Sequence, residues 1–267
     1  MVSNFNNNLE SRVASGQLCS SFGIKISSNA QVVQMARNAG FDSLFIDLEH
    51  GWLTLAEASN LCSVGHLSGI TPFVRVPHQC GNGFVQRVLD GGAMGVVFPH
   101  IHNAEDAKAA VRICKYPPFG SRSMMGNQPI FATQGVSIDD TISFCNKSGS
   151  TVFVMIEGKD AVEAANEIAA ADGVDVVLVG SSDLTVDMGI GGQFNNPIYR
   201  HSLERVSQAC KAHGKIFGVA GVYDSPEIQD WIINKLGARY MLVQQDTSLL
   251  VAGARQAVQS LPKAKQI

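Results

Sequence analysis

Polar, ionisable side chains end several short apolar segments of this sequence, and their types could support chemistry. Five segments with strand-like character end or continue in such residues: Asp47 and His50, Arg75, His100, Glu157, and Ser181, Ser182 and Asp183. These residues could also have purely structural roles. Glu157 and Asp183 could cap the helices that follow, His50 could be a loop histidine, and Arg75 could pair with Asp47 structurally. Because five segments independently place ionisable groups at the same kind of position, we predict an active site.

The residue types narrow the chemistry. Glu157 and Asp183, without a Cys or a close His pair, suit a hard, oxygen-preferring cation such as Mg²⁺ or Mn²⁺ that keeps positions open for substrate and water. Arg75 would supply a fixed positive charge near the negative charge that develops during the reaction. The backbone N–H groups of residues 181–183 would form an anion-binding nest for a substrate carboxylate. His50 is suited to moving a proton at neutral pH. Together these groups are what a 2-oxo acid needs to form an enolate.

Strand-like segments alternate with helix-length amphipathic segments along the whole chain. The strands are predicted over 18–26, 44–49, 72–76, 95–100, 152–157, 174–180, 215–220 and 239–245. The helices are predicted over 30–38, 55–64, 84–90, 104–114, 161–170, 198–212, 226–235 and 248–259. Eight such units favour a closed α/β barrel, the (β/α)₈ or TIM barrel, whose strand ends converge over one mouth. The competing doubly wound sheet lacks its G-x-G-x-x-G turn after the first strand.

Length and composition fit one such barrel. The 267 residues are 45% hydrophobic and 16% charged, with a net charge of −3 and no Lys/Arg block, which argues against a nucleic-acid partner. No apolar run approaches the roughly 20 residues of a membrane span. We expect a polar N-terminal stub over 1–15, the barrel over 16–261 and a short tail over 262–267. The long connection 116–150 is expected to cover the site and to hold a short helix near 138–146.

The N-terminus has no secretory pattern, and the six cysteines are widely spaced and never form C-x-x-C. We interpret them as buried thiols in a reducing compartment and expect a cytoplasmic protein.

Five ordered motifs resemble one enzyme family. They are IDLEHG at 46–51, VR at 74–75, YPPFGSR at 116–122, IE at 156–157 and GSSDLTVDMG at 180–189. In these motifs the chain resembles the 4-hydroxy-2-oxoheptanedioate aldolases, which are metal-dependent class II pyruvate aldolases related to citrate lyase β chains and fungal macrophomate synthase. The resemblance implies a (β/α)₈ barrel and a homo-oligomer, commonly a hexamer that exchanges its last helix. It also implies a carbon–carbon lyase acting on small 2-oxo acids and aldehydes.

The resemblance also implies roles for individual residues. Glu157 and Asp183 would bind the divalent metal, Mg²⁺ or Mn²⁺ with Co²⁺ or Zn²⁺ as further options, and Arg75 would steady the pyruvate enolate. His50 would be the base, with its orientation set by Asp90, and Asp47 would be a further polar site residue. Two positions suggest altered acceptor choice: Met155, where the family commonly has Gln, and Trp52, which could narrow the entrance.

Three alternatives remain open from the sequence. Lys25, which is flanked by Ile24 and Ile26 inside the first predicted strand, could form a Schiff base as in class I aldolases, although we favour its holding a substrate carboxylate. The same enolate chemistry could serve an oxaloacetate decarboxylase or a macrophomate-synthase-like enzyme. A non-enzymatic barrel that binds a metal or ligand is the third option.

Overall fold

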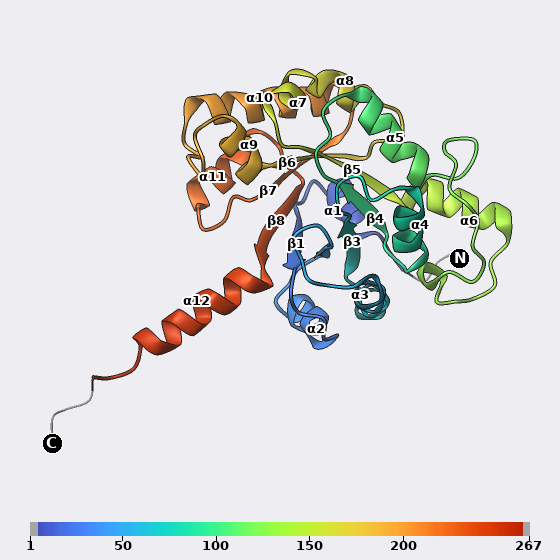
Figure 1. The fold of residues 1–267 in the computed structure, drawn as a ribbon, viewed down its shortest axis with the longest axis horizontal. Coiled ribbons are helices and arrows are strands. Elements are labelled where there is room, and N and C mark those ends of the chain that lie inside the picture. The colour runs from blue at the N-terminus through green and yellow to red at the C-terminus, as the bar shows by residue number, and fades with distance from the viewer. Residues whose placement is uncertain (1–4, 264–267) are drawn as a thin grey trace.

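The computed structural model describes residues 5–263, so the outermost residues of the predicted stub and tail lie outside the described part. Eight parallel strands close into a barrel in chain order, as Figure 1 shows at the centre of the molecule. They are β1 (Cys19–Ile24), β2 (Ser43–Asp47), β3 (Thr71–Arg75), β4 (Gly95–Phe98), β5 (Thr151–Ile156), β6 (Val176–Gly180), β7 (Ile216–Ala220) and β8 (Tyr240–Gln245). The predicted TIM barrel is confirmed, with strand ends shifted by a few residues.

Helices surround this barrel. They are α1 (Asn8–Ala14), α2 (Gln31–Asn38), α3 (Leu55–Ser68), α4 (Asn82–Asp90), α5 (Ala104–Cys114), α6 (Ile138–Phe144), α7 (Lys159–Glu163), α8 (Ala165–Ala170), α9 (Ser181–Asp187), α10 (Pro197–Ala212), α11 (Pro226–Asp230) and α12 (Asp246–Gln259). Two predicted helices differ in detail: 161–170 divides at Ala164, and the last turn of 226–235 is π-helical. Helix α9 was not predicted, because it begins directly where β6 ends.

The barrel strands are buried on both faces, which is why they appear in the sequence as continuous apolar runs. Inside the barrel, the rings of Phe73 and Phe153 lie 4.8 Å apart and those of Phe153 and Tyr240 5.0 Å apart. These aromatic side chains fill the interior, so the barrel is a packed core rather than a pore. All six cysteines are free thiols; five are buried and Cys80 is half-buried.

Helix α1 closes the end of the barrel where the strands begin. Leu9 is fully buried, the Asn7 side chain donates to Thr151 Oγ1 at 3.0 Å, and the Asn8 backbone N–H donates to Thr71 Oγ1 at 2.9 Å. Thr71 and Thr151 are the first residues of β3 and β5. The segment expected to be a polar stub therefore contributes a helix to the structure.

The long connection 116–150 lies at this same end, so the expectation that it covers the active site is wrong. It leaves the end of α5 and enters the start of β5, and a connection of that kind must lie at the amino ends of the strands. Its contacts agree: Asn7 donates to Ser148 O at 3.1 Å, and Lys115 Nζ donates to Ser150 O at 2.8 Å. Helix α6 confirms the short helix predicted within it.

Helix α12 extends away from the barrel, in red at the lower left of Figure 1. The Asp246 carboxylate fixes its first residue by accepting the backbone N–H groups of Lys25, Ile26 and Ser27, at 3.1, 3.0 and 2.9 Å. Farther along, Leu250, Val251 and Val258 are exposed. Within residues 5–263, no helix is long and apolar enough to cross a membrane.

Candidate active site

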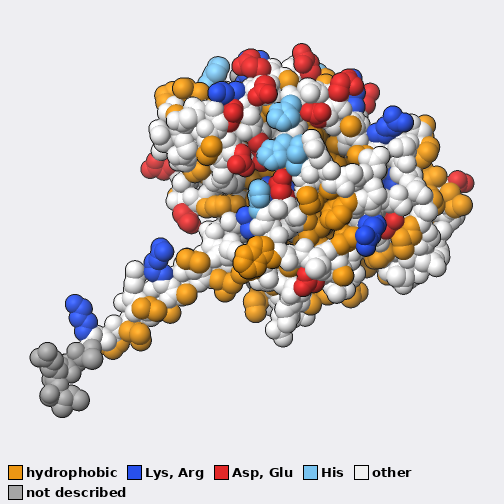
Figure 2. All heavy atoms as spheres, viewed as in Figure 1, with side chains coloured by type: hydrophobic (Ala, Val, Ile, Leu, Met, Phe, Trp, Pro, Cys, Tyr) orange, Lys and Arg blue, Asp and Glu red, His pale blue; other side chains and the backbone are white. Residues whose placement is uncertain are grey.

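A cavity of about 250 Å³ opens at the carboxyl ends of the strands. Figure 2 shows histidine side chains grouped at the centre of the displayed face, with acidic side chains around them and an apolar area beside them. Most of the residues predicted to form the site line this one cavity: Lys25, Asp47, His50, Arg75, Met155, Glu157, Ser181, Ser182 and Asp183. They come from the ends of β1, β2, β3 and β5 and from the start of α9, as the barrel topology requires.

Asp47 and Arg75 form a buried, two-pronged ion pair. They are register partners on the adjacent strands β2 and β3. Arg75 Nε donates to Asp47 Oδ1 at 3.0 Å, and Nη2 donates to Oδ2 at 2.6 Å. Burial would raise the pKa of Asp47, but the hydrogen bonds and charge of Arg75 outweigh it and hold the pKa below its ordinary value. The pair fixes the guanidinium plane at the floor of the cavity, over the Phe45 ring at 5.4 Å.

Glu49 gives Arg75 a second acidic partner that the sequence analysis did not assign to the site. Its Oε2 lies 3.1 Å from Arg75 Nη1, and its side chain is 8% exposed. Two N–H groups of the guanidinium, on Nε and Nη2, donate to Asp47, whereas the contact of Nη1 with Glu49 is an ion pair without a hydrogen bond. The remaining N–H donors of Arg75 lie on Nη1 and Nη2. Those donors are available to an anionic ligand in the cavity.

Glu157 and Asp183 face the same cavity, Glu157 from the end of β5 and Asp183 from the first turn of α9. Glu157 is buried, and its Oε2 accepts the backbone N–H of His100 at 2.8 Å. Asp183 lies exposed in the first turn of α9. Burial raises the pKa of Glu157, and the negative charge of Asp183 adds to the rise against the lowering effect of the His100 N–H. A cation between the two carboxylates would relieve this penalty.

The donor set fits a divalent metal that binds few protein ligands. Within residues 5–263, no three His, Cys, Asp or Glu side chains form a ligand group by themselves. Two carboxylates without a third protein ligand suit Mg²⁺ or Mn²⁺, which retain waters and take further oxygens from substrate. Gly180 leaves room beside Glu157, since a Cβ there would lie 2.6 Å from Oε1.

His50 lies at the rim of the cavity, and 55% of its side chain is exposed. Its backbone N–H donates to Asp47 Oδ1 at 3.1 Å, and its Nε2 lies 3.8 Å from Glu49 Oε2. The backbone of His50 is therefore fixed, while the 3.8 Å contact with Glu49 is the one ion-pair contact that its ring makes with the described residues. That position suits a group that exchanges protons with a bound substrate.

Lys25 has a charged partner within the cavity. Its Nζ lies 3.7 Å from Asp47 Oδ2, and 24% of its side chain is exposed. A Schiff-base lysine needs a desolvated site without a neutralising carboxylate. Lys25 instead forms an ion pair with Asp47 at the edge of the cavity, an arrangement suited to holding a substrate carboxylate.

The two serines differ in accessibility. Ser181 is buried and its hydroxyl accepts the hydroxyl of Tyr199 at 2.8 Å, whereas Ser182 is exposed. Ser182 is therefore the serine whose side chain is free to meet a ligand. Met155 is buried and forms an apolar part of the cavity wall.

Two predicted residues are not brought into the cavity. Trp52 is 88% exposed and attached to the rim through its backbone N–H, which donates to Lys25 O at 2.9 Å. Asp90 ends α4 and accepts Arg122 Nη2 at 2.9 Å. Because α4 runs back toward the amino ends of the strands, Asp90 lies far from His50, and the expectation that it orients His50 is not met within this chain.

Glu49 and two cavity residues, Tyr223 and Gln245, were not predicted from the sequence. Tyr223 follows β7, and Gln245 ends β8. Burial raises the pKa of Tyr223 to about 12, so it is a neutral hydrogen-bonding group at physiological pH. The signal that could have found them is the same one, a polar residue just after a barrel strand.

Comparisons with known proteins agree with this geometry. The model of the HpcH/HpaI aldolase/citrate lyase family matches residues 25–228. A 4-hydroxy-4-methyl-2-oxoglutarate aldolase from Hapsidospora irregularis is 53% identical over 250 residues, covering 94% of this chain and 93% of the relative. One from Chaetomium globosum is 51% identical over 257 residues, covering 96% of each. An HpcH/HpaI aldolase structure from Desulfitobacterium hafniense has a TM-score of 0.88 at 29% identity, covering 97% of this chain and 99% of that one.

Proposed function

Because this chain belongs to the HpcH/HpaI aldolase/citrate lyase family, we propose that it cleaves and forms the C3–C4 bond of 4-hydroxy-2-oxo acids through a pyruvate enolate. The chain is a carbon–carbon lyase of the aldolase type. The observation that supports an enolate in particular is the placement of Arg75. Asp47 and Glu49 hold its guanidinium in one orientation, and Arg75 lines the same cavity as Glu157 and Asp183.

The substrate we propose is 4-hydroxy-4-methyl-2-oxoglutarate, the acid named in two relatives at 53% and 51% identity. Breaking its C3–C4 bond gives one pyruvate as the enolate and a second pyruvate as the ketone. Proton transfer from the 4-hydroxyl and proton delivery to C3 balance the reaction without a co-substrate. The acceptor in the reverse direction is then a 2-oxo acid rather than a simple aldehyde.

Arg75 stabilises the negative charge that develops on the 2-oxo oxygen as the bond breaks. Asp47 and Glu49 hold the guanidinium before the substrate arrives, so no reorganisation is needed during the reaction. The free N–H donors of Arg75 face the enolate oxygen. Removing one such donor from an enzyme commonly costs about 10²–10³ in kcat.

Glu157 and Asp183 would hold the divalent cation, with Mg²⁺ or Mn²⁺ as the proposed metals and Co²⁺ or Zn²⁺ as weaker candidates. When bound, the cation supplies Lewis-acid polarisation of the 2-oxo acid.

His50 accepts the proton of the 4-hydroxyl during cleavage and delivers it to C3 of the enolate. In synthesis it removes the C3 proton of pyruvate and gives it to the acceptor carbonyl. Its exposed ring at the cavity rim is the position from which a proton can also reach solvent. Lys25 and Ser182 are proposed to hold the substrate carboxylates, and Met155 to shape the side of the cavity that meets the acceptor.

The experiment that tests this function follows pyruvate release from 4-hydroxy-4-methyl-2-oxoglutarate with Mg²⁺ or Mn²⁺ and with a chelator. We expect metal-dependent formation of two pyruvates per substrate. Oxaloacetate is supplied as a second substrate, because its decarboxylation gives the same enolate. Turnover of oxaloacetate without cleavage of the hydroxy acid would replace the aldolase proposal with a decarboxylase.

We further propose a homo-oligomer, hexameric as the family resemblance implies. Helix α12 carries exposed Leu250, Val251 and Val258 away from the barrel, and such apolar side chains are suited to burial against a second copy. The six free thiols support a reducing, cytoplasmic setting.

A further inference from the structure

His100 adopts a backbone conformation that is uncommon for residues other than glycine. It follows β4 at a φ of +53°, in the left-handed region, where Gly is favoured and Asn, Asp and His are enriched among the other residues. Backbone strain of this kind persists where the surrounding structure requires it, and it concentrates at functional sites. At His100 the conformation lets the backbone N–H and the imidazole face the same carboxylate.

That carboxylate is Glu157. The backbone N–H of His100 donates to Glu157 Oε2 at 2.8 Å, and the ring nitrogen Nδ1 lies 3.5 Å from the same oxygen. The Glu157 side chain is 4% exposed. His100 therefore contacts one oxygen twice and leaves the other, Oε1, on the side of Gly180 and the cavity.

The other nitrogen of the ring contacts a second carboxylate. His100 Nε2 lies 3.4 Å from Glu49 Oε1, and Glu49 Oε2 lies 3.1 Å from Arg75 Nη1. A continuous series of polar contacts thus runs from Arg75 through Glu49 and His100 to Glu157. It joins the residue proposed to stabilise the enolate to a proposed metal ligand.

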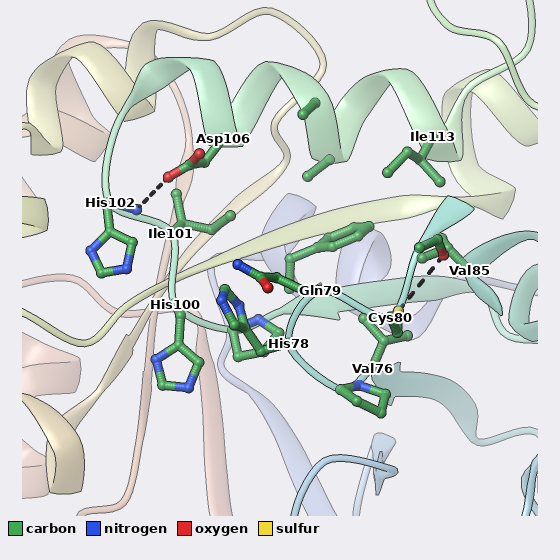
Figure 3. A pocket seen from close by; sticks show the side chains of 16 residues that line it. Val76, His78, Gln79, Cys80, Val85, His100, Ile101, His102, Asp106 and Ile113 are labelled. Atoms are coloured by element: carbon green, nitrogen blue, oxygen red, sulfur yellow. Dashed lines mark hydrogen bonds between the residues drawn. The ribbon is translucent and has the colours of Figure 1, made fainter. Parts of the chain in front are cut away.

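The ring of His78 packs against the imidazole of His100. The rings of His78 and His100 meet edge-to-face at 5.0 Å, and Figure 3 shows these two residues side by side. They line a second pocket of about 350 Å³, between the segments that follow β3 and β4. The His100 ring therefore lines this pocket and also contacts the carboxylates of Glu49 and Glu157.

We propose that His100 is a positioning residue for the metal site. It holds Glu157 with one oxygen directed to the cavity, and through Glu49 it ties the position of Glu157 to that of Arg75. The proposal rests on the proposed function, because Glu157 matters in this way only as a ligand of the divalent cation. Groups that hydrogen-bond a metal-binding carboxylate commonly change metal affinity about 10–100-fold when they are removed.

The test measures Mn²⁺ binding to the full-length protein by electron paramagnetic resonance of the free ion. His100→Asn keeps the left-handed backbone and the backbone N–H, but its side chain is too short to reach both carboxylates. We expect its Kd for Mn²⁺ to rise about 10–100-fold. His102→Asn is the matched control, because the exposed His102 ring contacts only Asp160, at 3.6 Å, among the ion pairs of the described residues. Its Kd should not change.

His100→Gly provides a second variant, because glycine takes this φ without strain. Both variants should lose Mn²⁺ affinity while their metal-free Tm stays close to that of the parent protein. Mn²⁺ affinity equal to the parent in either folded variant would overturn the positioning role. Glu157→Gln separates the two proposals: if it too binds Mn²⁺ like the parent, the proposed metal site itself is wrong.

Discussion

Gly180 lies directly against the Glu157 carboxylate: a Cβ at Gly180 would be 2.6 Å from Oε1 and 2.7 Å from Cγ of Glu157. Real Cβ atoms do not approach other atoms so closely, so any larger residue would displace Glu157. The absence of a side chain at Gly180, at the end of β6, therefore leaves open the space in which Glu157 is proposed to bind the cation.

Gly180→Ala is expected to weaken Mn²⁺ binding by at least about 10-fold, the lower range for a disturbed ligand environment. Isothermal titration with Mn²⁺ measures the change. Gly83→Ala is the matched control, since nothing lies within 4 Å of a Cβ at that helical position. Equal affinities in the two variants would show that Glu157 does not bind the metal.

Arg75→Lys is expected to lower kcat for cleavage about 10²–10³-fold, because an ammonium cannot keep the two-pronged contact with Asp47 and also present N–H donors to the enolate. Steady-state assays with 4-hydroxy-4-methyl-2-oxoglutarate check this. Arg87→Lys, on the exposed side of α4, is the control and should leave kcat unchanged. A purely structural pairing of Arg75 would instead lower the Tm and spare the kcat of the folded enzyme.

The raised pKa of Glu157 predicts that, without metal, the difference in folding stability between the parent protein and Glu157→Gln depends on pH. Burial is the main reason that its pKa is raised above the ordinary glutamate value of about 4.3. Between that value and the raised pKa, the folded chain binds more protons than the unfolded chain, so stability falls as the pH rises through the folded pKa. Glu157→Gln removes this loss and should be more stable than the parent near pH 8, with the gain disappearing near pH 4.

Urea unfolding at the two pH values, with chelator present, measures that difference. Saturating Mn²⁺ should reverse the order near pH 8, because the cation stabilises only the folded parent. A Glu157→Gln variant that is less stable than the metal-free parent near pH 8 would contradict the raised pKa.

Lys25→Met tests the class I alternative. Lys25 lies beside Asp47 and is proposed only to hold a carboxylate, so metal-dependent turnover should persist with a higher KM. Borohydride added to the parent enzyme with pyruvate should trap no covalent adduct by mass spectrometry. Complete loss of turnover together with a trapped adduct would establish a Schiff base and displace the enolate mechanism proposed here.

The strand pattern could be predicted because parallel barrel strands are buried on both faces, and the same topology places polar residues after the strands at one mouth. Glu157 and Asp183 followed from that reasoning. His100 was also placed at a strand end, but its contacts with Glu157 and Glu49 could not be predicted, because they depend on a left-handed backbone that its sequence neighbours do not reveal. Asp90 was assigned to His50 by resemblance, and only the direction of α4 shows that it lies at the other end of the barrel.

The central claim is that the protein makes a pyruvate enolate with a metal at Glu157 and Asp183 and with His50 as the base. Proton exchange at C3 of pyruvate in deuterated water, followed by NMR, measures that step without a second substrate. We predict exchange that requires Mg²⁺ or Mn²⁺, stops with a chelator, and falls sharply in Glu157→Ala and His50→Ala. Exchange that continues at full rate in chelator would contradict the mechanism.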